Sequence, residues 1–293
     1  MGILLGLATA LSWGSADLFA RFATRSIGTF RTMLYMQLTG FLMLTGAMHW
    51  LGGWGPLAHG SGWQLWAWGI GAGVLNTSGT LALYRSFEIG KMSIVAPISA
   101  SYPALTMLLA ALTGERLTIA RFAGVTVIIL GVIVVARGET VPGDANPLDA
   151  SRPRKRYLGV SWALLSAFGF GVMFWLLGIR VIPMMGAAPS VWMIRLTSVL
   201  TTGLVMLITR RPMQLPDPGA DRWILGVGIL DTSAYVFNNF GMLREQVSVV
   251  SVLASLYGAV TVGLAALILK EKIVRMQWAG ILAIFAGIVL ISR

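Results

Sequence analysis

The sequence contains no cysteine and only two histidines, His49 and His59. Disulfides and thiolate metal sites are therefore excluded, and two histidines beside one loop are too few for a histidine-based metal site. No phosphate-binding glycine loop, metal-ligand cluster or nucleophile–base set stands out either. The sequence therefore predicts neither an enzyme nor an ATP-driven pump, and it predicts no cofactor.

Charge is also scarce. Asp, Glu, Lys and Arg make up 11% of the 293 residues, against about a quarter in soluble proteins. Hydrophobic residues make up 56%, and the mean hydropathy is +0.79. These values predict an integral membrane protein. The net charge of +11 does not indicate a nucleic-acid partner, because the basic residues are spread over short segments instead of forming one basic face. Such bases are typical of loops beside anionic membrane lipid.

A helix of about 20 apolar residues crosses the hydrocarbon core of a bilayer. The chain contains ten such segments, at roughly 2–24, 31–51, 64–86, 91–113, 119–137, 157–181, 188–209, 222–243, 246–269 and 274–292. The first follows Met1 without a basic segment or a small-residue cleavage site, so we expect a retained span. The polar, proline-containing stretch 138–156 predicts a linker. We therefore expect an all-α membrane protein with five helices in 1–137 and five in 157–293.

The two halves resemble each other. Without gaps, residues 99–137 match 255–293 at nine positions, among them Glu115/Glu271, Gly124/Gly280 and Gly131/Gly287. Self-similarity at a fixed period marks duplicated architecture. Because each half has an odd number of spans, we expect the second copy upside down relative to the first. Secondary transporters use such inverted repeats for alternating access, with substrate held near the midplane. One chain supplies both halves, so a monomer is sufficient, although an oligomer is not excluded.

Several stretches resemble the drug/metabolite transporter superfamily, EamA type, and the resemblance covers essentially the whole chain. They are ALSWGSADLFARFA (10–23), YRSFEIGKMSIVAPISASYPALTMLLAALTGERL (84–117), GERLTIARFAGVTVIILGVIVVA (114–136), VSVVSVLASLYGAVTVGLAALILKEKI (247–273) and KEKIVRMQWAGILAIFAGIVLIS (270–292). The resemblance implies an inner-membrane carrier with a central cavity between the repeats. Family members move amino acids, nucleotide-like metabolites, vitamins and drugs, so the substrate stays open. Ser-Leu-Tyr-Gly at 255–258 departs from the family's Tyr-Pro, which Tyr102-Pro103 preserves in the first half.

Two arguments about orientation conflict. Thirteen basic residues flank the side shared by the loops after the first, third, fifth, seventh and ninth spans, and five flank the side of the termini. Under the positive-inside rule this places the termini outside the cytoplasm. The family resemblance implies cytoplasmic termini instead.

An ionisable side chain at mid-membrane is a functional hypothesis by default. Asp231 lies near the middle of the eighth expected span, and Tyr235 and Asn238 follow at i+4 and i+7, on one helix face. The stripe either faces a wet cavity, where Asp231 carries a proton, or makes structural hydrogen bonds between helices.

Three further charges lie within spans. Asp17 and Arg21 are four residues apart, so we expect them to pair with each other. If Asp17 faces the cavity instead, it could hold a substrate amine. Arg195 lies deep in the seventh span and either binds an anionic substrate or pairs with Asp231 or Asp17.

Polar and aromatic residues near the same depth complete the candidate set. Asn76 lies one place from the repeat equivalent of Asp231. Pro97 and Pro103 predict a kink in the fourth span. The remaining candidates border that kink, its counterpart in the second half, or Asp17; they are Ser101, Tyr102, Ser255, Tyr257 and Trp13. They either line a cavity or pack between helices.

Two features have structural interpretations. Glu271 follows the ninth span, and we expect it to form ion pairs or hydrogen bonds to neighbouring helix ends. The Gly124/Gly131 pair and its repeat, Gly280/Gly287, predict close helix packing.

The leading hypothesis is a secondary transporter that exports a small organic metabolite or drug across a bacterial inner membrane by alternating access, with proton coupling at Asp231 if coupling exists. An uncoupled facilitator is the nearest alternative. A lipid-handling or membrane-sensing protein that moves no solute is the alternative from another class.

Overall fold

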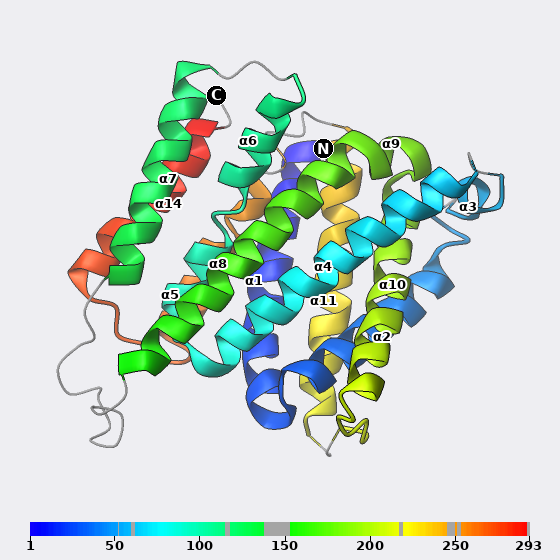
Figure 1. The fold of residues 1–293 in the computed structure, drawn as a ribbon, viewed down its shortest axis with the longest axis horizontal. Coiled ribbons are helices and arrows are strands. Elements are labelled where there is room, and N and C mark those ends of the chain that lie inside the picture. The colour runs from blue at the N-terminus through cyan, green and yellow to red at the C-terminus, as the bar shows by residue number, and fades with distance from the viewer. Residues whose placement is uncertain are drawn as a thin grey trace.

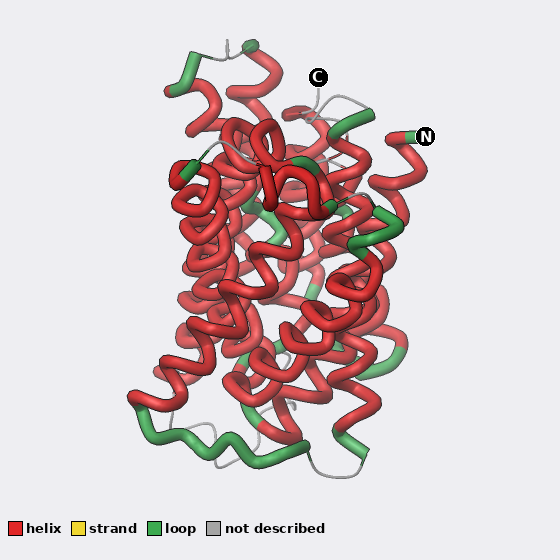
Figure 2. The backbone as a smooth tube through the Cα atoms, turned by 90° about the vertical axis from the view of Figure 1, so that its right-hand side faces the viewer, coloured by secondary structure: helices red, strands yellow, loops and turns green. Residues whose placement is uncertain are grey.

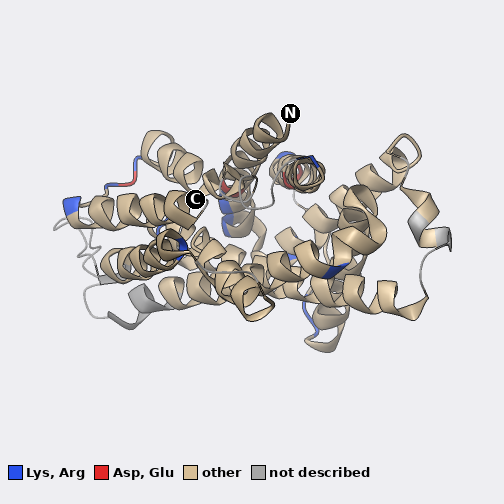
Figure 3. Cartoon of the chain, turned by 90° about the horizontal axis from the view of Figure 1, so that it is seen from above, with Lys and Arg blue, Asp and Glu red and all other residues tan. Residues whose placement is uncertain are grey.

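The computed structural model describes residues 1–51, 53–59, 62–114, 118–137, 153–216, 219–244, 250 and 253–291. Within these ranges the chain is helical and contains no strand (Figure 2). The helices run between two ends of the molecule, where the loops gather. Helix α1 begins and α14 ends at the same end (Figure 1). Lys, Arg, Asp and Glu are few along the helices (Figure 3), as the composition predicts.

The helices of the two halves follow in chain order. The first half contains α1 (Gly2–Ile27), α2 (Thr29–Ala47), α3 (Trp54–His59), α4 (Trp63–Ile89), α5 (Met92–Ser99), α6 (Pro103–Leu112) and α7 (Ile119–Arg137). The second half contains α8 (Pro153–Leu176), the π-helical turn η1 (Leu177–Val181), α9 (Ile182–Met185), α10 (Ala187–Ile208), α11 (Asp221–Met242), α13 (Tyr257–Leu267) and α14 (Arg275–Ile291). In the described part of the chain, four stretches are long and apolar enough to cross a membrane: Gly2–Ile27, Met92–Leu112, Gly159–Met185 and Ala187–Ile208.

The predicted kink in the fourth span is confirmed as a break between α5 and α6. Proline lacks an N–H donor, and Pro103 opens α6, where that donor would have no intrahelical partner. The preceding residues form a tight turn instead, in which Ser101 N–H donates to the Ile98 carbonyl at 3.2 Å and Tyr102 N–H to the Ser99 carbonyl at 3.3 Å. The turn carries Tyr102 into the interior.

Some predicted boundaries differ from the structure. The sixth helical stretch continues to Met185, because η1 and α9 extend α8 beyond the predicted end at 181. Residues 153–156, predicted as the end of the linker, belong to α8, and 138–152 lie outside the described residues. Of the predicted ninth span 246–269, the stretches 246–249 and 251–252 also lie outside them.

The helices pair across the two halves. α1 packs along α11, α4 along α8, α2 along α10 and α7 along α14. In the last pair the backbones touch at glycines, because a Cβ on Gly131 would lie 2.8 Å from the Gly280 carbonyl oxygen and one on Gly124 would lie 2.8 Å from that of Gly287. The predicted packing role of these glycines is confirmed.

Candidate functional site

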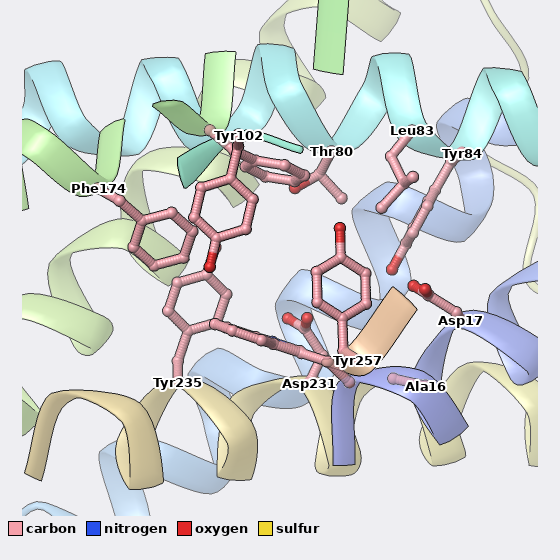
Figure 4. Close-up of a pocket in the computed structure, with 12 residues that line it drawn as sticks. Ala16, Asp17, Thr80, Leu83, Tyr84, Tyr102, Phe174, Asp231, Tyr235 and Tyr257 are labelled. Atoms are coloured by element: carbon pink, nitrogen blue, oxygen red, sulfur yellow. The ribbon is translucent and has the colours of Figure 1, made fainter. Parts of the chain in front are cut away.

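A small cavity lies between helices of both halves, near the middle of the bundle. Its volume is about 30 Å³, which is room for about two water molecules. It is lined by Trp13, Ala16, Asp17, Thr80, Leu83, Tyr84, Tyr102, Phe170, Phe174, Asp231, Tyr235 and Tyr257. These residues come from α1, α4, the α5–α6 turn, α8, α11 and α13 (Figure 4). Ligand pockets usually measure about 300 Å³ or more, so an organic ligand of ordinary size does not fit this cavity in the present conformation.

The walls of this central cavity are mainly aromatic. The Trp13 ring meets the rings of Tyr235, Phe174 and Tyr257 edge to face, with centroids 5.0, 5.8 and 5.9 Å apart. Tyr102 stacks on Phe174 at 4.8 Å. Aromatic faces are electron-rich and attract cations, most strongly where water is excluded. The walls therefore suit a group that is both apolar and positively charged.

Asp17 supplies negative charge to this aromatic enclosure. Its carboxylate accepts a hydrogen bond from the Thr261 hydroxyl at 2.8 Å, and the Tyr84 hydroxyl points toward it (Figure 4). Asp17 is 6% exposed, and no cationic side chain among the described residues lies within ion-pair distance of it. A buried carboxylate without a positive partner is costly, so Asp17 has the chemistry to take up a proton or a cationic ligand.

The predicted pair between Asp17 and Arg21 is wrong. Arg21 donates to the Gly90 carbonyl at 2.7 Å and lies 3.6 Å from Glu271. The i, i+4 spacing permits a contact on one helix, but Glu271 competes for the guanidinium from the other half of the chain. Asp17 faces the cavity, as the alternative interpretation expects.

Glu271 forms a clasp near the end of the bundle opposite the chain termini. Besides its ion pair with Arg21, it accepts hydrogen bonds from the backbone N–H of Met92 and from the N–H and hydroxyl of Ser93, at 3.2, 2.9 and 2.7 Å. The predicted bonding of Glu271 to neighbouring helix ends is confirmed. The clasp joins α1, the start of α5 and the segment before α14, one turn beyond Asp17 on α1.

Asp231 lines the central cavity, but its charge is neutralised by an arginine that lies outside the cavity lining. Arg195 Nη2 lies 2.6 Å from Asp231 Oδ2, and Arg195 Nη1 donates to Gln37 Oε1, also at 2.6 Å. Arg195 is fully buried and does not line the cavity. Of the two alternatives for Arg195, the structure places it in a pair with Asp231. Helix α2 approaches this pair through Gly40, where a Cβ would collide with the Thr232 hydroxyl.

Asn76 lies outside the cavity lining and holds one of the lining tyrosines. Asn76 is fully buried and accepts from the Tyr235 hydroxyl at 2.7 Å, while its amide donates to Ser198 at 3.3 Å. Tyr235 therefore has a fixed orientation. The Tyr257 hydroxyl extends into the cavity (Figure 4) and has no hydrogen-bond partner among the described residues.

Besides Arg195 and Asn76, three further predicted residues do not line the cavity. Asn238 donates to Asn239 and to the Met242 sulfur, one to two turns beyond Tyr235. Ser101 donates to the Ile98 carbonyl within the helix break. Ser255 is buried and is not part of the lining.

Sequence reasoning missed several members of the site. Tyr84 and Thr80 lie one turn apart on α4, and Phe170 and Phe174 one turn apart on α8. A repeat offset of 157, one more than the offset of the C-terminal match, relates Trp13 to Phe170 and Asp17 to Phe174. This offset was the sequence signal from which Phe170 and Phe174 could have been found. Gln37 and Thr261 had none, because their roles depend on contacts with helices far away in sequence.

Comparisons with known proteins agree with this architecture. The profile of the EamA-like transporter family matches residues 1–137 and 157–293. A solved crystal structure aligns over 99% of this chain and 96% of its own, with a TM-score of 0.70 and 19% identity, a likeness that shows the fold alone. An uncharacterised protein of Methanocaldococcus jannaschii is 36% identical over 74 residues, which are 25% of this chain. The chain spans about half (54%) of the length of that relative.

Proposed function

The chain belongs to the EamA-like transporter family, and from this premise we propose that it exports a small organic cation by alternating access, in exchange for protons at Asp17. The family is one of membrane transporters, not of enzymes. The observation that carries the substrate class is a buried carboxylate inside an aromatic enclosure, with no cationic partner among the residues that the structure describes.

The architecture that we propose is ten membrane-spanning helices in two inverted repeats, in a bacterial inner membrane. Reciprocal packing supports it: α1, the first helix of one half, packs on α11, and α8, the first helix of the other, packs on α4. Gly131 meets Gly280 while Gly124 meets Gly287, so each half contributes both members of the repeated glycine pair to α7–α14 contacts. A two-fold axis in the membrane plane produces this exchange.

The two carboxylates of the central cavity take different roles in this proposal. Asp231 already has Arg195 as a counter-ion at 2.6 Å, so a proton arriving there would have to displace a strong ion pair. Within the described part of the chain Asp17 has a hydroxyl partner only, and in an apolar site it is neutralised either by a proton or by a substrate cation. We therefore assign coupling to Asp17 instead of Asp231. Mutually exclusive occupancy of one carboxylate links the outward movement of a cation to the inward movement of protons.

Closure at both the site and the Glu271 clasp supports an occluded state. The aromatic walls have to separate before an organic molecule enters, because about 30 Å³ holds only water. Release of Glu271 from Arg21 and Ser93 would open one end, and rocking of the halves about α7 and α14 would open the other.

The decisive experiment is counterflow in proteoliposomes with matched probes. Tetraethylammonium, its neutral carbon isostere and a carboxylate of similar size are offered to the wild-type protein, Asp17→Asn and Asp231→Asn, with and without an imposed pH gradient. We expect gradient-driven accumulation of the cation alone, lost in Asp17→Asn. Flux of the cation without any effect of the gradient would favour an uncoupled facilitator. No flux of any probe through folded protein would favour a lipid-handling protein.

A further inference from the structure

A second and much larger hollow lies on the side of the bundle. Its volume is about 690 Å³, and it is formed by the lower parts of α4 and α8 in Figure 1, the end of α10 and the start of α2. Its walls are apolar and include Leu81, Ala82, Trp162, Leu165, Val205 and Met206. We call it the lateral groove. It faces away from the central cavity, since Thr80, Leu83 and Tyr84 occupy the other face of α4.

The lateral groove opens toward the region where the bilayer lies. Leu165 is 51% exposed and Val205 37% exposed, and both belong to helical stretches that are able to cross a membrane. At that depth the protein is surrounded by lipid acyl chains and not by water, so an acyl chain is the group that fills an apolar hollow. Lipid chains are as apolar as leucine, so filling the groove provides little selectivity by itself. Any selectivity has to come from the mouth.

The mouth of the lateral groove is basic. Arg31, Arg85 and Arg211 line it together with one acidic residue, Glu88. Arg85 pairs with Glu88 at 2.8 Å while 44% of its side chain stays exposed. This leaves two positive charges in excess at the end of the bundle opposite the termini.

The arginines are held in place before any ligand arrives. The Arg211 guanidinium lies over the Phe30 ring, 4.0 Å from its centroid. Arg31 donates to the carbonyls of Gln214 and Leu215 at 3.2 and 2.7 Å, which ties the segment after α10 to the start of α2. Guanidinium groups are suited to phosphate because their planar fork donates two parallel hydrogen bonds.

From this combination we propose that the lateral groove is a binding site for an anionic membrane phospholipid. One acyl chain lies along the walls formed by α4, α8 and α10, and the phosphate meets Arg85 and Arg211. Each arginine near a membrane surface favours an anionic headgroup about fivefold, so two favour it about 25-fold. The lateral groove does not depend on the proposal for the central cavity. The groove is proposed to bind an anion, whereas the central cavity is proposed to bind a cation.

Photo-crosslinking in nanodiscs tests this assignment. The probes are phosphatidylglycerol and phosphatidylcholine that carry a diazirine on the same acyl carbon, and labelled peptides are located by mass spectrometry. We expect phosphatidylglycerol to label the α4 and α8 peptides that contain Leu81 and Leu165 at least tenfold more than phosphatidylcholine does.

Three variants distinguish recognition of the lipid headgroup from binding of the acyl chain. Arg85→Gln/Arg211→Gln should lower phosphatidylglycerol labelling of these peptides to the phosphatidylcholine level. Arg180→Gln/Arg244→Gln, which removes two exposed arginines elsewhere, should leave it unchanged. Ser78→Phe places a ring in the groove and should reduce labelling by both lipids. All variants are first required to match the wild-type elution profile and melting temperature. Equal labelling by both lipids in the wild type, or labelling of α7 and α14 as strong as that of the groove, would overturn the proposal.

Discussion

Arg195 and Asp231 form an ion pair that joins α10 to α11, with Nη2 and Oδ2 2.6 Å apart. The arginine is fully buried, and the aspartate side chain keeps 17% of its surface exposed toward the cavity. Gln37 from α2 completes the network at 2.6 Å. The pair therefore connects three helices and presents a neutralised carboxylate to the site.

Replacing one member of this pair should lower the free energy of unfolding more than replacing both members by apolar residues. Asp231→Asn leaves a buried guanidinium without a counter-ion, and we expect the free energy of unfolding to fall by about 3–5 kcal/mol. Arg195→Gln should behave alike. Arg195→Met/Asp231→Leu should recover most of the loss, because no charge is then left buried. Denaturant unfolding in detergent measures each variant, with exposed Arg180→Gln as the control. Additive losses in the double variant would contradict the coupling.

Asp17→Asn should remove cation transport and its dependence on the pH gradient together. The amide keeps the Thr261 contact but carries no charge, so we expect apparent affinity for tetraethylammonium to fall about 30-fold or more. Thr261→Val keeps the charge and removes one hydrogen bond, and its loss should be about tenfold or less. Counterflow at several substrate concentrations measures both. Transport by Asp17→Asn that still responds to the gradient would exclude Asp17 as the coupling residue.

Trp13→Leu tests the aromatic enclosure. Leucine keeps an apolar wall but lacks the electron-rich face, and a desolvated cation–π contact is worth about 1–2 kcal/mol, or roughly 5- to 30-fold in affinity. We expect this loss for tetraethylammonium and little change for any residual binding of the neutral isostere. Trp175→Leu is the matched control, because Trp175 lies on the same bundle outside the cavity lining. An equal loss for the charged and neutral probes would indicate packing alone.

The Glu271 clasp can be tested cleanly because the chain has no native cysteine. Leu83→Cys places one thiol in the cavity wall. Adding Glu271→Gln removes the ion pair with Arg21 and should increase labelling by a water-soluble maleimide several-fold, because the end below Asp17 opens more often. Lys272→Gln, at the neighbouring exposed position, changes charge without removing a contact of the clasp and should have little effect. Unchanged labelling in Glu271→Gln would mean that the clasp does not gate this end.

Composition predicted the all-α architecture because it acts over the whole chain, and proline placement predicted the helix break because a proline acts locally. The break before Pro103 needs only a missing N–H donor. Small residues repeated in both halves predicted close helix packing, and the structure adds that Gly131 meets Gly280. The site was harder to predict. Asn238 shares a helix face with Asp231, but seven residues at 1.5 Å each place it about 10 Å further along the axis, beyond the cavity.

Charge partners were the least predictable part of the site. Arg21 has Asp17 within reach on its own helix, yet it contacts Glu271, 250 residues further along the chain. Gln37 and Thr261 bind Arg195 and Asp17 through contacts between helices. Such choices depend on how helices are rotated against each other, and a single sequence carries no direct signal of that rotation.

The α7–α14 contact provides the last prediction. A side chain on Gly131 has to displace the backbone of α14, since its Cβ would lie 2.8 Å from the Gly280 carbonyl oxygen. We expect Gly131→Leu to lower the free energy of unfolding by about 1–3 kcal/mol, as overpacking does elsewhere. Gly263→Leu on α13 is the matched control, because nothing lies within 4 Å of its Cβ position. Transport should fall with Gly131→Leu even under conditions where the protein remains folded, because the proposed rocking of the halves turns about this contact. If Gly131→Leu lowers stability but transports at the wild-type rate, α7 and α14 hold the halves together without serving as their hinge.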